Sequence, residues 1–305
     1  MKISLVIMAA GLGSRYGGSK QVDGIGPHGE MLMEYSIYDA LRAGFNKIVF
    51  VIKRDMEEHL RSLCGDSLAR RRAKDGSLVE VAYTYQDFSS VPAFYRLPEG
   101  RTKPFGTVHA LLCAEGAVQE PCCVINADDY YGISAYQAIY RELCAMPSQG
   151  RATMVGYLLK NTASLHGTVS RGVCRVEDGW LTSVREALKI QLYPDGTLRD
   201  LAEDVPLSPE TIVSMNFWGF SPSVFPDLRR YFEDFLRNEA GDNPTAECLL
   251  PMMVDSQMRS GRLKVSVLSS VDRWFGMTYH QDRQVVAEEL RRLHDQGVYP
   301  ERLWD

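Results

Sequence analysis

The amino-acid sequence predicts an α/β protein built on an open, mostly parallel sheet. Short apolar runs alternate with amphipathic segments through the first half of the chain, which is typical of parallel strands joined by right-handed helical crossovers. The first apolar run, Leu5 to Ala10, leads into a glycine-rich stretch, so a strand opens directly into a loop. From about residue 151 the pattern changes to strand pairs and turns, which predicts a strand-rich extension packed on the first half.

The elements of the first half follow from their periodicity and end signals. Between Glu34 and Ala43, the side chains of Tyr35, Tyr38 and Leu41 share one helical stripe, and Gly44 is a natural stop. The other predicted elements, in order, are a strand at Leu5 to Met8, a strand at Lys47 to Ile52, a helix capped by Asp55 that runs through Leu63 and stops at Gly65, a strand at Leu78 to Tyr85, a helix at Val108 to Ala117 and a strand at Cys122 to Asn126.

The second half reads as strands followed by a closing helix. The predicted strands are Ala152 to Leu159, Gly172 to Val176, Thr182 to Arg185 and Ile212 to Phe220. Gln281 to Gln296 is a charged amphipathic helix that either caps the domain or contacts another subunit, so a homo-oligomer stays open as an alternative. Residues 87 to 105 form a proline- and glycine-bearing loop, long enough to suggest a lid or a substrate contact.

Composition narrows the class of partner. The chain has 305 residues, of which 45% are hydrophobic and 24% are charged, as is typical of a globular protein with a substantial core. Its net charge of −5 argues against nucleic acid as a partner. A basic cluster, Arg70 to Arg72 with Lys74, is the local exception, and we interpret it as the solvated end of a helix.

The sequence gives no sign of a membrane or an export route. No apolar segment approaches the roughly 18 to 20 residues that span a bilayer, and the N-terminus lacks the pattern of a secretory signal. The seven cysteines include no C-x-x-C and no zinc-site spacing. We therefore predict reduced thiols and a cytoplasmic protein.

The glycine-rich loop from Leu5 to Gln21, LVIMAAGLGSRYGGSKQ, predicts a phosphate-binding site. Glycines let backbone N–H groups approach an anion closely, and Arg15 and Lys20 add charge that neutralises phosphate oxygens. A dinucleotide-binding G-x-G-x-x-G loop is excluded because Tyr16 stands where its third glycine belongs. The ATPase loop is excluded because Ser19 and Lys20 stand in reversed order.

A second acidic signal, N-A-D-D-Y-Y-G, follows the strand that ends at Asn126. In open α/β sheets ligands bind beyond the carboxyl ends of the strands, so Asp128 is expected near the glycine-rich loop. A carboxylate that faces a triphosphate needs a cation between them, and Mg²⁺ prefers one or two carboxylates with phosphate oxygens and waters. The alternative is that Asp128 caps the next helix.

The motifs A-A-G-L-G-S-R, S-K-Q and N-A-D-D-Y-Y-G together resemble the nucleotidyltransferases that join a sugar 1-phosphate to a nucleoside triphosphate, with glucose-1-phosphate thymidylyltransferase the best-known relative in pattern. The resemblance runs in order along most of the chain and weakens after residue 190. It implies a Rossmann-like open, mostly parallel sheet of the nucleotide-diphospho-sugar transferase type with a strand-rich sugar-binding extension. It implies one domain over residues 1–305, with a nucleotide-binding half at 1–150, a sugar-phosphate-binding half at 151–280 and a C-terminal helix at 281–305.

The resemblance also assigns roles to individual residues. It implies that the triphosphate lies on Ala10, Gly11 and Gly13, with Arg15 and Lys20 as the charged catalytic members and Asp128 as the Mg²⁺ ligand. It implies that Gln86, Gly106 and Thr107 contact the base and that Gly172, Glu186, Lys189 and Asn216 form the sugar site.

Three departures from the family pattern limit what the resemblance implies. The spacing from Gln86 to Gly106 is far longer than in the thymidylyltransferases, so the base preference does not transfer. The lysine expected after the sugar-binding glutamate is Ala187, with Lys189 the nearest replacement. The late W-x-D motif that carries a second metal carboxylate reads Trp274-Phe275-Gly276, with Asp272 or Asp282 as candidate substitutes.

The sequence therefore predicts an enzyme that joins a nucleoside triphosphate and a sugar 1-phosphate to give a nucleotide sugar and pyrophosphate. One alternative is a cytidylyltransferase for phosphocholine or another alcohol phosphate, for which an aromatic cage would be diagnostic, or a nucleotidyltransferase of cofactor synthesis. A second is a non-catalytic sensor of nucleotide or sugar phosphate, favoured by Gly276. A nicotinamide dehydrogenase is the weakest, because of Tyr16.

Overall fold

One sheet of eleven strands organises the computed structural model, in which residues 1–11, 24–270, 272–276 and 282–304 are described. A separate pairing joins two further short strands, β5 (Asp129–Tyr130) and β13 (Phe275–Gly276). The strands of the large sheet are β1 Ser4–Met8, β2 Lys47–Ile52, β3 Glu80–Tyr85, β4 Cys122–Asn126, β6 Arg151–Leu158, β7 Val169–Glu177, β8 Trp180–Leu192, β9 Leu198–Asp200, β10 Val205–Leu207, β11 Ile212–Phe220 and β12 Lys264–Ser269.

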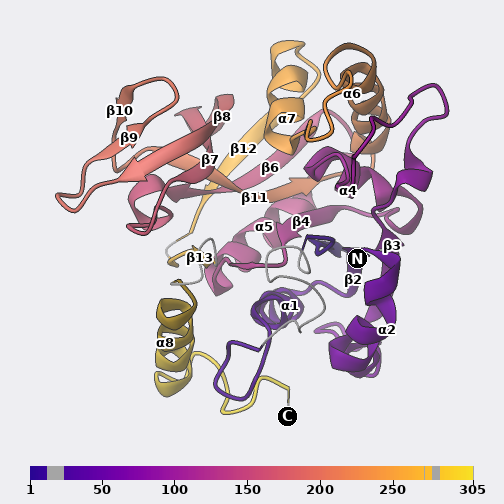
Figure 1. The fold of residues 1–305 in the computed structure, drawn as a ribbon. Helices are drawn as coiled ribbons and strands as arrows, with labels where there is room; N and C mark the ends of the chain where they lie inside the picture. The colour runs from indigo at the N-terminus through magenta and orange to yellow at the C-terminus, as the bar shows by residue number, and fades with distance from the viewer. Residues whose placement is uncertain (12–23, 271, 277–281, 305) are drawn as a thin grey trace.

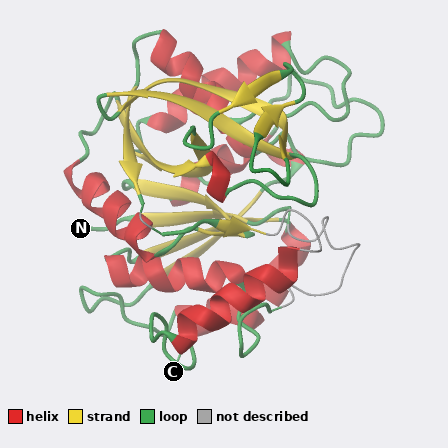
Figure 2. Ribbon diagram, turned by 90° about the vertical axis from the view of Figure 1, so that its left-hand side faces the viewer, coloured by secondary structure: helices red, strands yellow, loops and turns green. Residues whose placement is uncertain are grey.

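Helices lie on both sides of this sheet (Figures 1 and 2). They are α1 Leu32–Ala43, α2 Glu57–Leu60, α3 Asp66–Leu68, α4 Thr107–Cys113, α5 Ile133–Ala145, α6 Val224–Asn238, α7 Leu250–Arg259 and α8 Asp282–Asp295. None of the helices in the described residues combines the length and the apolar character needed to cross a bilayer.

The mixed α/β class predicted from the sequence is confirmed, but the sheet is parallel only in part. In the first half the neighbours β3, β2, β1 and β4 all run parallel. In the second half β6, β11, β7, β8 and β12 pair in a closed circuit, in which only β12 and β6 run parallel. The predicted open, mostly parallel sheet therefore describes the first half, whereas the strand-rich second half curls on itself (Figure 2).

Alternation along the central strands places one set of side chains on each face of the sheet. On β1, Leu5 and Ile7 join the core beneath α1 and α5, while Val6 joins the core beneath α4, α6 and α7. The same division holds for Cys123 and Cys122 on β4. Since full burial of such an apolar side chain stabilises the fold by roughly 1.5–3 kcal/mol, these strands are fixed by both faces at once.

Several predicted elements are confirmed and one helix differs. Lys47 to Ile52, Cys122 to Asn126 and Ile212 to Phe220 are strands with the predicted bounds. For the helix predicted from Asp55, both the N-terminal cap and the stop at Gly65 were predicted incorrectly. Lys53 is the residue before its first turn and no side-chain cap bond forms, and the helical path continues as a π turn through Gly65 to Leu68. The second half also contains α6 and α7, and β8 extends far beyond the predicted Thr182 to Arg185.

Gly65 serves close packing rather than helix termination. A Cβ atom at this position would lie 1.8 Å from the Tyr83 hydroxyl, so only glycine lets the π turn lie against β3.

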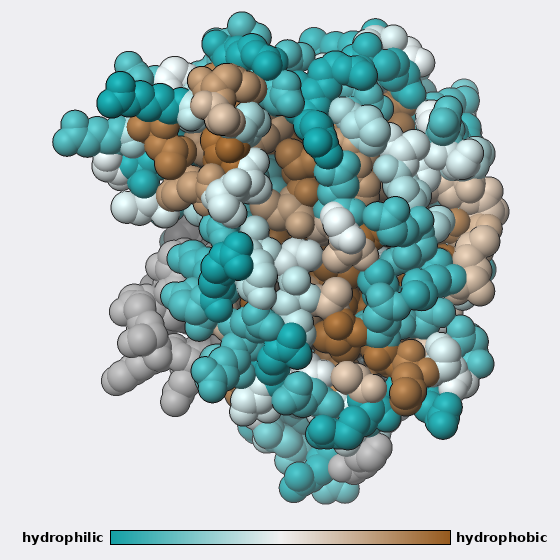
Figure 3. Space-filling view, turned by 90° about the vertical axis from the view of Figure 1, so that its right-hand side faces the viewer, coloured by the Kyte–Doolittle hydropathy of each residue, from teal (hydrophilic) through white to brown (hydrophobic). Residues whose placement is uncertain are grey.

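On the face that carries α2, β3 and α4, hydrophilic residues dominate the surface and apolar residues form separate small groups (Figure 3).

The segment after the last helix packs back on the first helix through a buried polar network. The Tyr299 hydroxyl donates to Asp39 Oδ2 at 2.8 Å, and the Tyr130 hydroxyl lies 2.8 Å from that of Tyr299. Asp39 is 1% exposed, and burial raises its pKa, opposed by the Tyr299 hydrogen bond and the charge of Arg42. This network ties α1, β5 and the segment after α8 together, so α8 caps the fold within its own chain.

The raised pKa of Asp39 predicts a pH dependence of stability. The folded protein binds the Asp39 proton more tightly than the unfolded chain, so stability should fall as pH rises above about 4. Relative to Asp39→Asn, the wild type should lose up to about 1.4 kcal/mol per pH unit where the group titrates. Urea denaturation between pH 4 and 8 measures this difference.

The matched control is Asp200→Asn. Burial alone would raise the pKa of Asp200, but the ion pair with Arg185 at 2.8 Å and backbone donors outweigh it and lower the pKa. Its contribution is therefore complete above about pH 4 and lost on further acidification. A stability difference between Asp39→Asn and the wild type that did not change with pH would contradict the assignment.

Candidate active site

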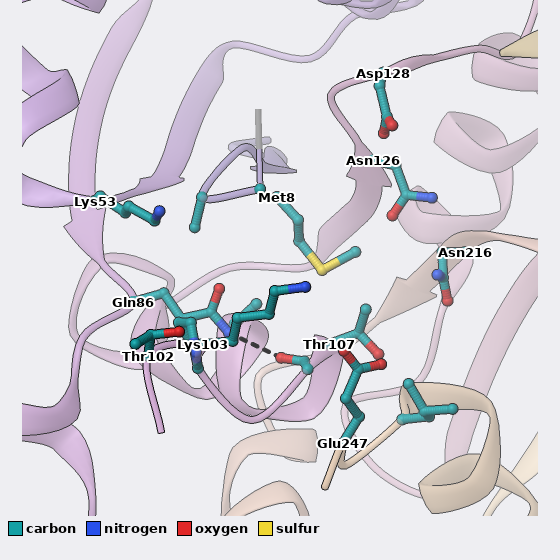
Figure 4. Close-up of a pocket in the computed structure, with 16 residues that line it drawn as sticks. Met8, Lys53, Gln86, Thr102, Lys103, Thr107, Asn126, Asp128, Asn216 and Glu247 are labelled. Carbon is teal, nitrogen blue, oxygen red and sulfur yellow. Dashed lines mark hydrogen bonds between the residues drawn. The ribbon is translucent and has the colours of Figure 1, made fainter. Parts of the chain in front are cut away.

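A pocket of about 420 Å³ lies at the carboxyl edge of the four parallel strands. Each strand contributes a residue at or just beyond its end: Met8 from β1, Lys53 after β2, Gln86 after β3 and Asn126 from β4. In the sheet register Met8 lies opposite Asn126, so these strand ends meet at one level. Figure 4 shows their side chains converging on a common space. The position agrees with the general location of ligand sites in α/β sheets.

The pocket gathers seven of the residues singled out in the sequence. They are Ala10, Gly11, Gln86, Gly106, Thr107, Asp128 and Asn216. Gly13, Arg15 and Lys20 lie outside the described residues. Gly172, Glu186 and Lys189 are described, and they do not line this pocket.

Gln86 and Gly106 are joined directly. Gln86 Nε2 donates to the Gly106 carbonyl at 2.9 Å (Figure 4). Gly106 has φ +84°, and a Cβ atom there would lie 2.9 Å from the Cys248 carbonyl oxygen. Thr107 accepts a 2.8 Å hydrogen bond from the Leu250 backbone N–H. The start of α4 is therefore held between the end of β3 and the chain that enters α7.

Asn216 lies at an irregularity of β11 and faces the pocket. The pairing of β11 with β6 shifts between Ser214 and Trp218, and Asn216 itself has φ +58°. Its Oδ1 atom is buried and has no hydrogen-bond partner among the described residues. A strained backbone that holds an unsatisfied amide oxygen in a cavity is costly, so it is a reasonable marker of a ligand contact.

The two adjacent aspartates have different surroundings. Asp128 lines the pocket, and its carboxylate points inward in Figure 4. Asp129 is buried and accepts hydrogen bonds from Asn126 Nδ2 at 2.8 Å and from the Tyr131 hydroxyl at 3.1 Å. The alternative that Asp128 caps the following helix is wrong: α5 has Gly132 at its N-cap, and the carboxylate that accepts from its first turn belongs to Asp272.

Gly276 has no room for a side chain. It pairs with Asp129 across β5 and β13, and a Cβ atom there would lie 2.6 Å from Asp129 Oδ1 and 2.7 Å from the Trp274 ring. The two candidate substitutes are engaged elsewhere: Asp272 Oδ2 accepts from the Ser134 N–H at 2.6 Å, and Asp282 Oδ1 accepts from the Ser164 hydroxyl at 3.4 Å. Neither lines the pocket.

The described part of the chain contains no group of three or more histidine, cysteine or acidic side chains arranged to hold a metal ion. What the pocket offers a hard cation is the carboxylate of Asp128 beside the amide of Asn126. This donor set fits Mg²⁺ held largely by substrate phosphates and water, and it does not fit a protein cage.

The predicted sugar residues form a second group in the curled half. Gly172 and Glu186 lie opposite each other on β7 and β8, and the Ser170 hydroxyl donates to Glu186 Oε1 at 2.6 Å. Burial raises the pKa of Glu186, Ser170 and Arg171 oppose this, and the nearby charge of Glu247 adds to it. Because Glu247 lines the pocket, Glu186 lies within electrostatic reach of the pocket wall. Lys189 is exposed, beyond an irregularity in the β7–β8 pairing.

Sequence reasoning missed three charged residues of the pocket, Lys53, Lys103 and Glu247. Among the described residues neither lysine makes an ion pair or a hydrogen bond, and Figure 4 shows both ammonium groups turned into the cavity. The signal for Lys53 was its position directly after a correctly predicted strand. Lys103 lies in the loop 87–105, which was already expected to contact a substrate.

The loop that carries Lys103 is anchored by the buried guanidinium of Arg101. Its nitrogens donate to the carbonyls of Ala246 at 2.7 Å, Pro104 at 3.1 Å and Asn243 at 3.2 Å. The same group lies 3.5 Å from the centre of the Phe105 ring. The loop is therefore a fixed wall of the pocket as well as a link between the two halves.

His109 has a packing role. Its ring stacks on Phe232 at 5.0 Å, and burial lowers its pKa to about 4. Nδ1 accepts from the Phe105 N–H at 3.3 Å, so Nε2 carries the proton and donates to the Ser90 hydroxyl at 2.7 Å. A neutral, fully engaged imidazole holds the loop 87–105 against α4 and leaves no acid–base role in the pocket.

Solved structures share this fold over nearly the whole chain. One is a putative glucose-1-phosphate thymidylyltransferase from Bacillus anthracis in complex with a sucrose, with TM-score 0.62, 14% sequence identity and coverage of 95% of this chain and 95% of that one. Another is a UDP-glucose pyrophosphorylase complexed with UDP-glucose, with TM-score 0.60, 16% identity and coverage of 96% and 99%. Comparison with protein-family models and with curated proteins finds no match.

Both neighbours are sugar-1-phosphate nucleotidyltransferases, so the resemblance seen in the sequence is confirmed at the level of the fold. At these identities the likeness establishes architecture, and the chemistry has to be argued from the pocket itself.

Gly106→Ala tests whether the start of α4 is held as described. The conformation at φ +84° is essentially restricted to glycine, and the added Cβ would press on the Cys248 carbonyl, so we expect a loss of at least about 2 kcal/mol in unfolding free energy. Chemical denaturation measures it. Gly116→Ala is the control, because a Cβ at Gly116 meets nothing within 4 Å and should be neutral or slightly stabilising. Equal stability of the two variants would contradict this reading of Gly106.

Proposed function

We propose that this protein is a nucleotidyltransferase that joins a nucleoside triphosphate and a sugar 1-phosphate, giving a nucleotide sugar and pyrophosphate. The observation that carries the proposal is the convergence of Gly11, Gln86, Gly106 and Asp128, which come from four separate segments, in one pocket. The fold shared with two sugar-1-phosphate nucleotidyltransferases supports the same class.

In this proposal the pocket has a base end and a phosphate end. Gln86, Gly106 and Thr107 receive the base, with the Gln86 amide fixed by its bond to the Gly106 carbonyl. Ala10, Gly11 and Gly13 receive the triphosphate, with Arg15 and Lys20 as its charged partners. A phosphate oxygen of the sugar 1-phosphate attacks the α-phosphorus in line, that oxygen–phosphorus bond forms, and the bond to the leaving pyrophosphate breaks.

Catalysis in this reaction rests on positioning and charge neutralisation. The attacking phosphate is already ionised at pH 7, so no general base is needed. Lys53 and Lys103 stand where negative charge accumulates, and their ammonium groups are available for phosphate oxygens. Such preorganised charges lower the barrier because they need no rearrangement when the reaction proceeds.

Asp128 is the proposed ligand of a Mg²⁺ ion, assisted by the Asn126 amide. When bound, the ion would neutralise charge shared between the α- and β-phosphates. Because position 276 has no room for a carboxylate, the coordination of an ion on Asp128 would be completed by phosphate oxygens and water.

The acceptor end of the site is assigned to Asn216 with Gly172 and Glu186. The Asn216 side chain lines the pocket, and its amide is the proposed partner of a sugar hydroxyl, while Glu186 is influenced by the charge of Glu247 on the pocket wall. Lys189 stays a prediction from the family resemblance. No aromatic side chain lines the pocket among the described residues, so the cage that a quaternary ammonium requires is not provided there.

Asp128→Asn tests the phosphate end. With a panel of four nucleoside triphosphates and several sugar 1-phosphates, we expect Mg²⁺-dependent pyrophosphate release by the wild type and a loss of about 10²- to 10³-fold in the variant. The control is Asp178→Asn, at an exposed left-handed turn that suits asparagine equally well. Phosphocholine in the same panel tests the alternative acceptor. If the protein bound triphosphate without releasing pyrophosphate, the proposed enzyme function would be wrong and a nucleotide sensor would be favoured.

Lys53→Gln and Lys103→Gln test the role of the two lysines. Each removes one charge from the phosphate region, so we expect turnover to fall by roughly 10- to 100-fold with the unfolding free energy nearly unchanged. Lys160→Gln is the control, since Lys160 is exposed and paired with Glu210 at 2.6 Å. Wild-type turnover in both pocket variants would remove the lysines from the site.

A further inference from the structure

A second cavity lies at the other end of the parallel strands and is lined on three sides by basic residues. It has a volume of about 790 Å³ and is enclosed by the end of α1, residues 70–74 and the C-terminal segment 300–304. Since residues 70–79 lead into the start of β3, and α1 ends just before β2, this basic groove lies at the amino edge of the strands. The pocket described above is at the carboxyl edge.

Six cationic side chains line the basic groove and no acidic side chain does, among the described residues. They are Arg42, Arg70, Arg71, Arg72, Lys74 and Arg302. None of the six makes an ion pair within 4.0 Å in the described part of the chain, although the protein as a whole carries a net charge of −5. The concentration of positive charge is thus local and is not a consequence of overall basicity.

Several arginines on other surfaces of the same protein pair with acidic neighbours. On α6, Arg229 pairs with Glu115, Arg230 with Asp227 and Arg237 with Glu233. Like charges confined to one groove repel over a screening distance of about 8 Å at physiological salt. A multiply charged anion in the groove would relieve this repulsion.

The guanidinium groups are held in place by the backbone. Arg71 Nη2 donates to the Trp304 carbonyl at 2.7 Å, and Arg72 Nη1 donates to the Gly76 carbonyl at 2.6 Å. Arg71 Nε is buried and has no hydrogen-bond partner among the described residues. These bonds fix the position of each fork and leave further N–H groups for an anion.

Arg70 to Arg72 follow directly on the end of α3, in agreement with the expected helix end, and together with Lys74 they form part of a tight hairpin. The α3 helix ends at Leu68, and the chain then turns back on itself, with the Val79 N–H bonded to the Arg71 carbonyl at 2.9 Å and the Ala73 N–H bonded to the Ser77 carbonyl at 2.8 Å. These bonds fix the backbone of the hairpin from which the cationic side chains reach the groove.

Aromatic rings complete the wall of the groove. Tyr38 and Trp304 meet edge to face with centroids 5.5 Å apart, and the Arg71 guanidinium lies 4.7 Å from the Trp304 ring centre. Arginine forks match phosphate geometry, and rings accept a planar base. A cavity of this size is also in the range of small-molecule sites.

We propose that the basic groove is a second binding site, separate from the pocket at the carboxyl edge, for the polyphosphate group of a small molecule such as a nucleoside di- or triphosphate. The arginines and Lys74 receive the phosphates, and Trp304 with Tyr38 receives the base. The proposal does not depend on the function assigned to the first pocket.

The test is the stoichiometry of ligand binding to the full chain. Equilibrium dialysis with a nucleoside triphosphate and, separately, with inorganic pyrophosphate at about 0.15 M salt compares the wild type with the triple variant Arg70→Gln, Arg72→Gln, Lys74→Gln. We expect the triple variant to lose one equivalent of bound ligand, with affinity at that site at least tenfold weaker. If the triphosphate binds more tightly than pyrophosphate, the aromatic wall contributes to the affinity. If the two ligands bind equally, the affinity comes from the phosphates alone.

Two controls keep the test decisive. The variant Arg229→Gln, Arg230→Gln, Arg237→Gln removes the same charge from α6 and should keep both equivalents. The pair Arg42→Gln, Arg302→Gln acts from the other side of the groove and should repeat the loss if the hairpin variant folds poorly. If the first pocket binds nothing, the wild type should bind one equivalent and the groove variants none. Unchanged stoichiometry and affinity in both groove variants, or binding of an RNA oligonucleotide without binding of either small polyphosphate, would overturn the proposal.

Discussion

The parallel pairing of β1 between β2 and β4 is the constraint on which the rest of the structure depends. Its register sets Met8 opposite Asn126 and Val51, so the three strands end at the same level. Both faces of these strands are buried, and a slip of one residue would exchange the two hydrophobic cores. The loop at Gly11 and the carboxylate of Asp128 are therefore brought together by apolar packing that involves neither of them.

The second half of the chain completes the pocket by reaching over this edge. Asn216 enters from the irregular part of β11, and Glu247 enters from the segment that leads into α7. That segment is tied to the first half by the Thr107 bond to the Leu250 N–H and by Arg101. The cavity therefore lies between the two halves of the sheet. Its shape depends on contacts between residues more than a hundred positions apart.

The sequence predicts an element of the fold well where a single strong local signal determines its type and its ends. Lys47 to Ile52 is an apolar run with clear ends, so its bounds were correct. The segment of α6 has apolar residues at helical spacing, with Leu228, Phe232 and Phe235 on one face. This signal was present in the sequence, although strands and turns were predicted for the second half. Other features had no local signal: the closed circuit in the second half depends on pairings between distant strands, and the length of β8 depends on partners on both of its edges.

Position 276 departs from the family pattern in the sequence, and the structure shows why a side chain does not fit there. Asp129 Oδ1 and the Trp274 ring already fill the volume that a side chain would need. A chain that cannot place a second carboxylate at this point presents less negative charge to a cation and leaves more phosphate charge to be balanced by other means. Lys53 and Lys103 line the pocket, and the loop that carries Lys103 is the one whose length departs from the family pattern. In the proposed reaction, the ammonium groups of Lys53 and Lys103 would balance part of the phosphate charge that position 276 leaves to other groups.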